Sequence, residues 1–290
     1  MNKFLLFLLK SLARLPFWGL YCLSDIISFI LYHLVGYRKK IVRKNLTEAF
    51  PEKSKNEIKD IEKKFYRYLS DQIVETVKLF HISDQSLISR VKVNNAEIIN
   101  DTMRNGRNAV LLMGHYNNWE WVQEITRYFL PDVFMVSIYH PMKDKFWENA
   151  FIELRNRWGA NIVPMPSAPR TLLNKANFPW VCGFIADQRP GQRSPENCMQ
   201  FLNHKMYFIY GPEVIGDKVK AEYFYLEMLR EKRGRYIINF HKLEPEDKEV
   251  PYPYTREFWK EFGETIKKYP PYWLWSHNRW KLQPEDMVNV

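Results

Sequence analysis

The sequence is poor in cysteine and has none of the spacings that cysteine-dependent sites require. Its three cysteines, Cys22, Cys182 and Cys198, are an odd number and show neither a metal-binding nor a redox pattern. This favours a reducing compartment for the main body of the protein. The H-E-x-x-H pattern of zinc proteases is absent as well, and there is no internal repeat or low-complexity tract. A hydrophobic content of 46% argues against wholesale disorder and is enough for a sizeable core.

The N-terminal region also lacks the features of a signal peptide. Its first apolar run, at residues 4–9, is short, Lys10 interrupts it, and no small-residue cleavage site follows. Residues 17–37 are apolar and long enough to cross a bilayer as a helix, but Asp25 lies inside them. A carboxylate in mid-membrane costs roughly 2.5–3.5 kcal/mol on insertion scales. We therefore predict a membrane anchor at residues 1–37 and leave two modes open, a spanning helix and an amphipathic helix or helical hairpin in the interface.

Charge and aromatic content indicate a surface that meets anionic groups. Lysine and arginine number 43 against 33 aspartates and glutamates, which gives a net charge of +10. A basic surface favours nucleic acid, anionic lipid head groups or an acidic carrier protein, and composition alone does not choose among them. The 10 Trp and 17 Tyr residues suit a membrane interface, because each side chain has an apolar body and a polar tip. The larger basic cluster beside the apolar run should stay in the cytoplasm with the main body, and it consists of Arg38, Lys39, Lys40, Arg43 and Lys44.

From residue 38 onward the patterns predict one α/β domain, which we place at residues 38–290. Ser54 and Glu57 form a capping box, and the apolar residues after it recur at steps of three and four, as in an amphipathic helix. Short apolar runs then alternate with helical segments, which predicts a mixed sheet flanked by helices. A last helix is expected at 255–269, where Pro270 stops it. The apolar runs cover residues 109–113, 133–138, 161–165, 181–186, 219–228 and 235–241.

The segment AVLLMGHYNNWE, residues 109–120, carries the candidate chemistry. It predicts a buried strand, then His115, then a helix that starts near Asn117 or Asn118. Functional groups gather beyond the C-terminal ends of strands in open α/β sheets, and His115 lies at such a place. His115 and Glu120 would not share a face of one helix, so they can meet only if His115 lies in the turn and Glu120 in the first helical turn.

In that arrangement the two side chains would form a proton relay. The carboxylate of Glu120 would fix the tautomer of His115, and the imidazole would take a proton from a hydroxyl group. A second interpretation stays open on this segment alone. Glu120 would then be a helix-capping carboxylate and His115 a loop histidine whose hydrogen bonds go to backbone.

Four separated segments together resemble one known family. They are GHYNNWE at 114–120, ADQR at 186–189, PPYWLWSHNRWK at 270–281, and a stretch at 139–159 that holds Tyr139, Pro141, Asn149, Arg155, Arg157 and Gly159. The set resembles the lipid A biosynthesis late acyltransferases, which belong to the lysophospholipid acyltransferase superfamily. The block RKKIVRKNLTEAFP at 38–51 is similar too, so the resemblance runs over nearly the whole chain.

The resemblance implies a glycerolipid-acyltransferase-like fold and a bacterial inner-membrane enzyme that faces the cytoplasm. It implies transfer of a fatty acyl chain from acyl carrier protein to a hydroxyl of an anionic lipid A precursor. No metal, no cofactor and no nucleic-acid partner are expected. By motif, His115 would be the general base and Glu120 its orienting carboxylate. Four further residues would line the active site or hold substrate, namely Arg155, Arg157, Asp187 and Gln188.

Three of these residues also have purely structural interpretations. Asp187 ends an apolar run, so it should lie at the mouth of the sheet, where it would contact substrate or the His115 site, or else cap local backbone. Arg155 and Arg157 follow a helical stretch. They would bind anionic sugar phosphates bidentately, or else form a solvated helix end.

Some positions depart from the family pattern, and two other functions stay open. His140 stands where many relatives have arginine, and Tyr272 where many have glutamine; both changes leave the reaction class intact. The Phe-Pro-Glu-Gly-type phosphate motif is absent, which counts against a glycerol phosphate acceptor. The other functions are acylation of another lysolipid or amino-acid lipid, and a non-catalytic membrane or RNA-binding protein. RNA binding would use the aromatic and basic residues at 273–280, for which core packing is favoured because they alternate as in a strand.

Overall fold

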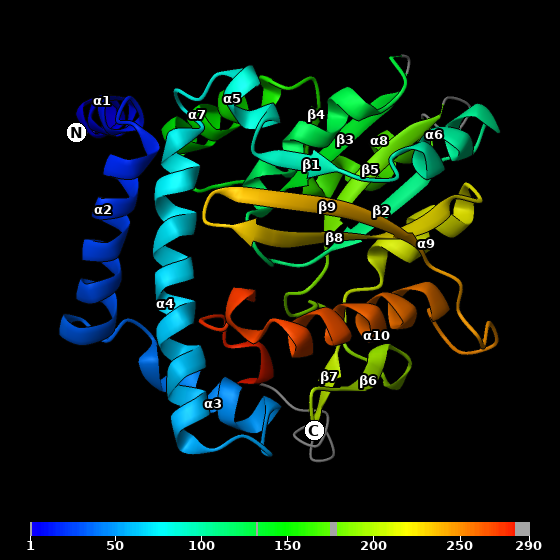
Figure 1. Cartoon of the computed structure of the whole chain (residues 1–290). Coiled ribbons are helices and arrows are strands. Elements are labelled where there is room, and N and C mark those ends of the chain that lie inside the picture. The colour runs from blue at the N-terminus through cyan, green and yellow to red at the C-terminus, as the bar shows by residue number, and fades with distance from the viewer. Residues whose placement is uncertain (1, 132, 175–178, 282–290) are drawn as a thin grey trace.

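A seven-stranded sheet forms the centre of the computed structural model, which describes residues 2–131, 133–174 and 179–281 (Figure 1). The strand order is β1-β9-β8-β2-β5-β3-β4. β8 and β9 pair antiparallel and the other neighbours pair parallel, which confirms the predicted mixed sheet. The strands are Val91–Val93 (β1), Ala109–Met113 (β2), Phe134–Tyr139 (β3), Asn161–Pro164 (β4), Trp180–Ile185 (β5), Glu222–Lys232 (β8) and Arg235–Lys242 (β9).

Six of these seven strands coincide, within a few residues, with the predicted apolar runs. The exception is β1, which has three residues and an exposed lysine at its centre, so it carries no apolar run. A separate hairpin of β6 (Cys198–Phe201) and β7 (His204–Tyr207) was not predicted either.

Helices cover both faces of the sheet because its strands are apolar on both sides. Along β2, Val110 and Leu112 enter one core, whereas Ala109 and Leu111 enter the other. The first core also receives side chains from α8, α9 and α10, and the second from α5, α6, α7 and the 3-10 helix η2. These helices are Asp84–Ile88 (α5), Glu97–Arg104 (α6), Trp119–Tyr128 (η2), Lys145–Asn156 (α7), Ala168–Asn174 (α8), Gly211–Lys218 (α9) and Pro253–Lys268 (α10).

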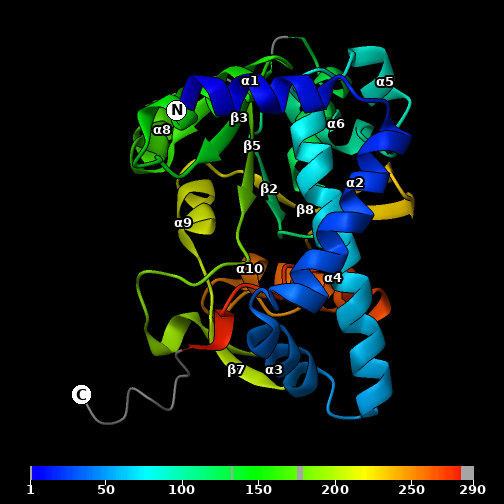
Figure 2. The same cartoon turned by 90° about the vertical axis from the view of Figure 1, so that its left-hand side faces the viewer.

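The helix α4 (Lys55–Lys78) stands along one side of the molecule and begins at the predicted capping box (Figure 1). α3 (Lys39–Ala49) packs near its start, α2 (Phe17–Phe29) lies beside it, and α1 (Asn2–Ala13) crosses near its end (Figure 2). α2 continues into a short π-helix (Ile30–Leu34). Together they form a segment that is long and apolar enough to cross a membrane, judged by length and composition only, of which 17% is buried.

The segment after α10 differs in part from its prediction. The alternation at 273–280 indicated a strand, but the structure has an isolated bridge between Tyr116 and Trp273 and short 3-10 helices at Pro270–Tyr272 and Arg279–Lys281. The tryptophans of this segment are buried, as core packing requires. Residues 282–290 of the predicted domain lie outside the described residues.

Candidate active site

A tight turn after β2 presents His115 at the edge of the sheet. Gly114 opens it, and a Cβ atom there would lie 2.2 Å from the ring of Phe262, so only glycine fits. Asn117 adopts a left-handed φ of 51°, which asparagine tolerates. Asn118 then caps η2, because its side chain accepts a hydrogen bond from a backbone N–H in the first turn. The predicted strand, turn and helix start are therefore confirmed, although the helix is of the 3-10 type.

His115 is hydrogen-bonded to Asp187, which follows the neighbouring strand β5. The imidazole Nδ1 lies 2.6 Å from Oδ1 of Asp187, and the backbone N–H of His115 donates to Oδ2 at 2.9 Å. The indole N–H of Trp273 donates to the same oxygen at 2.8 Å. Since β2 and β5 are parallel neighbours in register, the residues that follow them meet at one edge of the sheet. Asp187 is only 4% exposed, and these three donors replace the water that its carboxylate loses on burial.

The surroundings keep the carboxyl group of Asp187 ionised. Burial by itself would raise the pKa of Asp187, but the charge and hydrogen bond of His115, the charge of Arg279 and the bond from Trp273 lower it to about 2. An ionised Asp187 accepts hydrogen bonds and cannot donate them. A neutral His115 therefore carries its proton on Nδ1 and presents the lone pair of Nε2.

The Nε2 atom of His115 lies next to a side-chain amide. The amide nitrogen of Gln188 lies 3.3 Å from it, and the ring of Trp119 meets the imidazole edge-on with centroids 5.0 Å apart. The His115 side chain is 17% exposed. An incoming hydroxyl can therefore replace Gln188 as the partner of Nε2. Among the residues that the structure describes, no group of three or more His, Cys, Asp or Glu side chains is placed to hold a metal ion.

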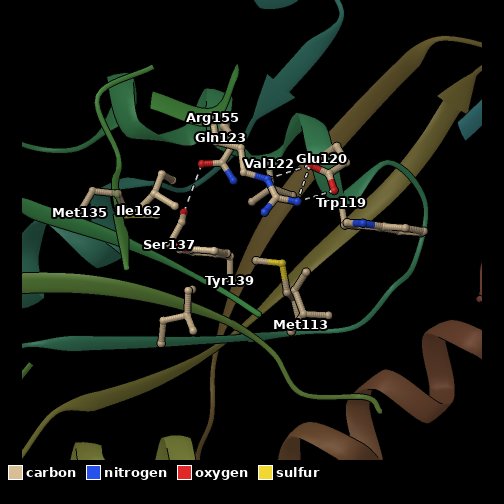
Figure 3. Close-up of a pocket in the computed structure, with 13 residues that line it drawn as sticks. Met113, Trp119, Glu120, Val122, Gln123, Met135, Ser137, Tyr139, Arg155 and Ile162 are labelled. Carbon is tan, nitrogen blue, oxygen red and sulfur yellow. Dashed lines mark hydrogen bonds and ion pairs between the residues drawn. The ribbon is translucent and has the colours of Figure 1, made fainter. Parts of the chain in front are cut away.

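The structure does not show the predicted hydrogen bond between His115 and Glu120. The Glu120 carboxylate is held by Arg155, whose guanidinium donates three hydrogen bonds to it over 2.7–3.2 Å (Figure 3). Glu120 does lie in the first turn of η2, as required, but its side chain is directed to α7, where Arg155 is found. Asp187, and not Glu120, is therefore the carboxylate that is hydrogen-bonded to the imidazole of His115. A role for Glu120 and Arg155 in the reaction stays a prediction.

Glu120 and Arg155 border a cleft with an empty volume of about 560 Å³ (Figure 3). Trp119 lines this cleft, and its ring also meets the imidazole of His115, which does not itself line the cleft. Elsewhere in the cleft, the hydroxyl of Ser137 donates to Gln123 at 3.1 Å. The rest of the lining is mainly apolar and consists of Met113, Val122, Met135, Ile138, Tyr139, Ile162, Gly183 and Ile185.

Arg157 is bound to backbone beyond the end of α4 and not to the cleft. Its guanidinium donates to the backbone oxygens of Leu79 and Ile82 at 2.7 and 2.8 Å, just beyond the C-terminus of α4, and it stacks on Trp158. Cations suit this end of a helix because the carbonyl dipoles point toward it. Arg157 is not among the residues that line the cleft, and its role in substrate binding stays a prediction.

Glu75 of α4, which supports the turn that carries His115, was not predicted. Its buried carboxylate accepts hydrogen bonds from Asn118 at 2.6 Å, from Tyr236 at 2.6 Å and from Tyr21 of α2 at 2.9 Å. Burial raises the pKa of Glu75 to about 7, against the lowering effect of the bond from Tyr236. A signal was present: Asp71, Glu75 and Lys78 recur at helical spacing, and all three are buried.

The comparison with protein families agrees with the motifs. The model of the bacterial lipid A biosynthesis acyltransferase family matches residues 2–282 of this chain. The match includes the turn that carries His115, the residues Asp187 and Gln188 that contact its imidazole, and the N-terminal helices. No curated protein matches the chain.

Proposed function

This chain belongs to the bacterial lipid A biosynthesis acyltransferase family, and from that premise we propose that it moves a fatty acyl chain from acyl carrier protein to a hydroxyl of a lipid A precursor. Membership makes it an acyltransferase with an acyl donor and a lipid acceptor. The carrier protein, the acceptor hydroxyl and a location at the cytoplasmic face of the inner membrane are parts of the proposal. The observation that carries the chemistry is the 2.6 Å hydrogen bond between His115 and Asp187 beyond the ends of β2 and β5.

In the proposed reaction His115 is the general base. Its Nε2 removes the proton of the acceptor hydroxyl, and the resulting alkoxide attacks the thioester carbonyl of the donor. The tetrahedral intermediate collapses to the new ester and a thiolate, and the imidazolium returns its proton to the thiolate. Asp187 is a positioning residue: it fixes the tautomer and stabilises the imidazolium while the proton is held. Gln188, whose amide nitrogen lies 3.3 Å from Nε2, is the donor that we assign to the oxyanion.

The cleft suits a fatty acyl chain in its chemistry. Most of its lining is apolar, which favours burial of methylene groups at roughly 0.8 kcal/mol each. Its polar border is the ion pair of Glu120 and Arg155. We propose that Arg155 contacts the polar part of a substrate and that Glu120 holds its guanidinium in place.

The test is acyl transfer by purified protein with several acyl carrier thioesters and candidate lipid acceptors, with products identified by mass. His115→Ala should lower kcat by on the order of 10²–10⁴, because proton transfer in the transition state is lost. His81→Ala is the matched control, since His81 is exposed at the end of α4, and it should keep wild-type turnover. Full turnover by His115→Ala would refute the mechanism, and transfer only to other lysolipids would refute the acceptor.

A further inference from the structure

Exposed apolar side chains are concentrated on the N-terminal helices. In the described part of the chain, thirteen of the twenty large apolar side chains that are exposed belong to residues 2–37. Trp18, at 74% exposure, is the most exposed of them. A soluble monomer rarely leaves so much contiguous apolar surface in water, so this surface is expected to be covered. The thirteen are Phe4, Leu5, Phe7, Leu8, Leu12, Leu15, Trp18, Ile26, Phe29, Ile30, Leu34, Val35 and Tyr37.

The two helices that carry this surface lie on one side of the molecule. α1 and α2 both lie on the left in Figure 1, and Figure 2 shows that side with α1 running across α4 and α2 running along it. α1 is tied down at both ends: Asn2 donates to Asp144 at 3.0 Å, and Lys78 donates to the backbone oxygen of Ala13 at 2.8 Å. A flat surface can therefore contact α1 and α2 along their lengths at the same time.

The inner side of α2 is bound to the protein by polar groups. Ser24 donates to Asp71 of α4 at 2.6 Å, and Tyr21 donates to Glu75 at 2.9 Å. Asp25 is paired with Arg233 of the β8–β9 hairpin at 2.7 Å. If α2 crossed a bilayer these bonds would break, because α4 and the hairpin would stay in water. Asp25 would then enter the hydrocarbon unpaired, at roughly 2.5–3.5 kcal/mol.

The charge of the same region identifies what covers it. Residues 1–44 contain eight lysines and arginines but a single acidic residue, Asp25, which is already paired. Lys3, Lys10, Arg14 and Arg38 are exposed beside the apolar side chains. Apolar groups flanked by cations fit a leaflet with anionic head groups, where each lysine or arginine near the surface contributes about 1 kcal/mol.

We propose that α1 and α2 lie flat in the head-group region of one leaflet, so that residue 2 and the catalytic domain are on the same side of the membrane. Membrane attachment belongs to the proposed function, whereas this in-plane mode goes beyond it and does not depend on the acceptor. It places the site near the lipid, since Tyr21 of α2 and Asn118 of the catalytic turn bind the same carboxylate, Glu75.

Sidedness is the decisive measurement. In the full chain with Cys22→Ser and Cys198→Ser, a single cysteine is placed at Lys3→Cys or at Lys248→Cys, an exposed position of the catalytic domain. Buried Cys182 stays, and the variant without an added cysteine gives its background. In sealed vesicles, a membrane-impermeant maleimide should label both positions from the same side. Labelling of Lys3→Cys only from the side opposite to Lys248→Cys would overturn the proposal.

Partition onto lipid vesicles tests the surface itself. The double variant Phe7→Ser and Trp18→Ser should bind vesicles of 30% phosphatidylglycerol in phosphatidylcholine at least about tenfold more weakly than wild type, because two large apolar side chains no longer insert. Val214→Ser, an exposed apolar position on α9, is the matched control and should bind as wild type. Unchanged binding by the double variant would overturn the surface assignment. His115→Ala should bind normally, so a failure of the proposed reaction is distinguishable from a failure of this inference.

Discussion

At the scale of single residues, three donors from two distant parts of the chain converge on Asp187. The ring and the backbone N–H of His115 approach from the end of β2, and the indole of Trp273 approaches from the segment after α10. The carboxylate therefore orients the imidazole and also holds the segment after α10 against the turn that carries His115. Changes at Asp187 should be visible both in the reaction and in stability.

Asp187→Asn should lower kcat by on the order of 10²–10⁴ with a small change in KM, because a neutral amide does not stabilise the imidazolium. Asp187→Glu keeps the charge and should recover part of the loss. The pH profile of kcat should also change shape in Asp187→Asn, which a merely structural role would not produce. Asp101→Asn, at an exposed site on α6, is the control for a neutralised carboxylate.

The stability of the same variant should depend on pH. The pKa of Asp187 is lowered from 3.8 to about 2 in the folded protein. The ionised carboxylate thus stabilises the fold at a pH above about 4, by on the order of 2 kcal/mol, and this contribution is lost as the pH falls through about 2. Denaturant titrations should show a constant gap between wild type and Asp187→Asn near neutral pH and a shrinking gap below about pH 4. A gap that persists unchanged in acid would contradict the assignment.

A double-mutant cycle separates two roles for Glu120. If Glu120 acts by holding Arg155, Glu120→Gln and Arg155→Ala should each lower kcat/KM by about tenfold or more, and the double variant should be little worse than either. If Glu120 acted on His115, as the sequence suggested, the effect of Glu120→Gln would persist in the Arg155→Ala background. Additive losses in kcat/KM would thus favour the sequence-based geometry over the one in the structure.

The sequence predicts that Asp187 lies at the mouth of the sheet near His115, but it favours Glu120 as the carboxylate that orients the imidazole, and the reason is physical. His115 follows a fully buried strand, and a continuous apolar run encodes such a strand locally. The carboxylate that meets it is 72 residues away, at the end of a neighbouring strand. That contact depends on β2 and β5 being adjacent, which the local pattern does not encode. Glu120 was chosen because it is close in sequence, and closeness along the chain says nothing about which way a side chain points.

At the scale of elements, Glu75 of α4 joins α2 to the turn that carries His115, because it binds Tyr21 and Asn118. Burial raises the pKa of this carboxyl group from 4.5 to about 7. Between those values the folded state binds more protons than the unfolded state, so the free energy of unfolding should fall as the pH rises, by on the order of 3 kcal/mol. Glu75→Gln should lack this slope, as followed by denaturant titrations from pH 4.5 to 7. A wild-type slope in Glu75→Gln would show that another group titrates.

The elements themselves were predictable where burial follows a simple period. The strands of the sheet centre and the helix α10 match their predicted ranges because whole runs or one stripe of side chains are buried. The residues from 273 to 280 alternate like a strand, but they form irregular backbone whose tryptophans pack against Phe262 of α10 and His204 of β7. Alternation reports which side chains are buried and does not require a partner strand.

At the scale of the whole molecule, one arginine joins α2 both to α4 and to the β8–β9 hairpin. Arg233, in the turn between β8 and β9, contacts Asp25 of α2 at 2.7 Å and Asp71 of α4 at 2.6 Å. Its guanidinium also stacks on the ring of Tyr21, and the guanidinium carbon lies 4.6 Å from the ring centroid. Asp71 is buried and is also paired with Arg230. Its negative charge is therefore balanced by two arginines, as a buried carboxylate requires.

Removing this arginine should loosen α2 without unfolding the sheet. Arg233→Ala leaves Asp25 unpaired and Asp71 with Arg230 and Ser24 alone, which should lower the free energy of unfolding by about 1–3 kcal/mol. Trypsin should then cleave within residues 1–40 several-fold faster in detergent solution, whereas anionic vesicles should restore protection, because the leaflet holds α2 from its other side. Lys232→Ala, an exposed neighbour in the same hairpin, should cleave at the wild-type rate. Equal cleavage of Arg233→Ala and wild type in detergent would mean that apolar contacts with α4 suffice to hold α2.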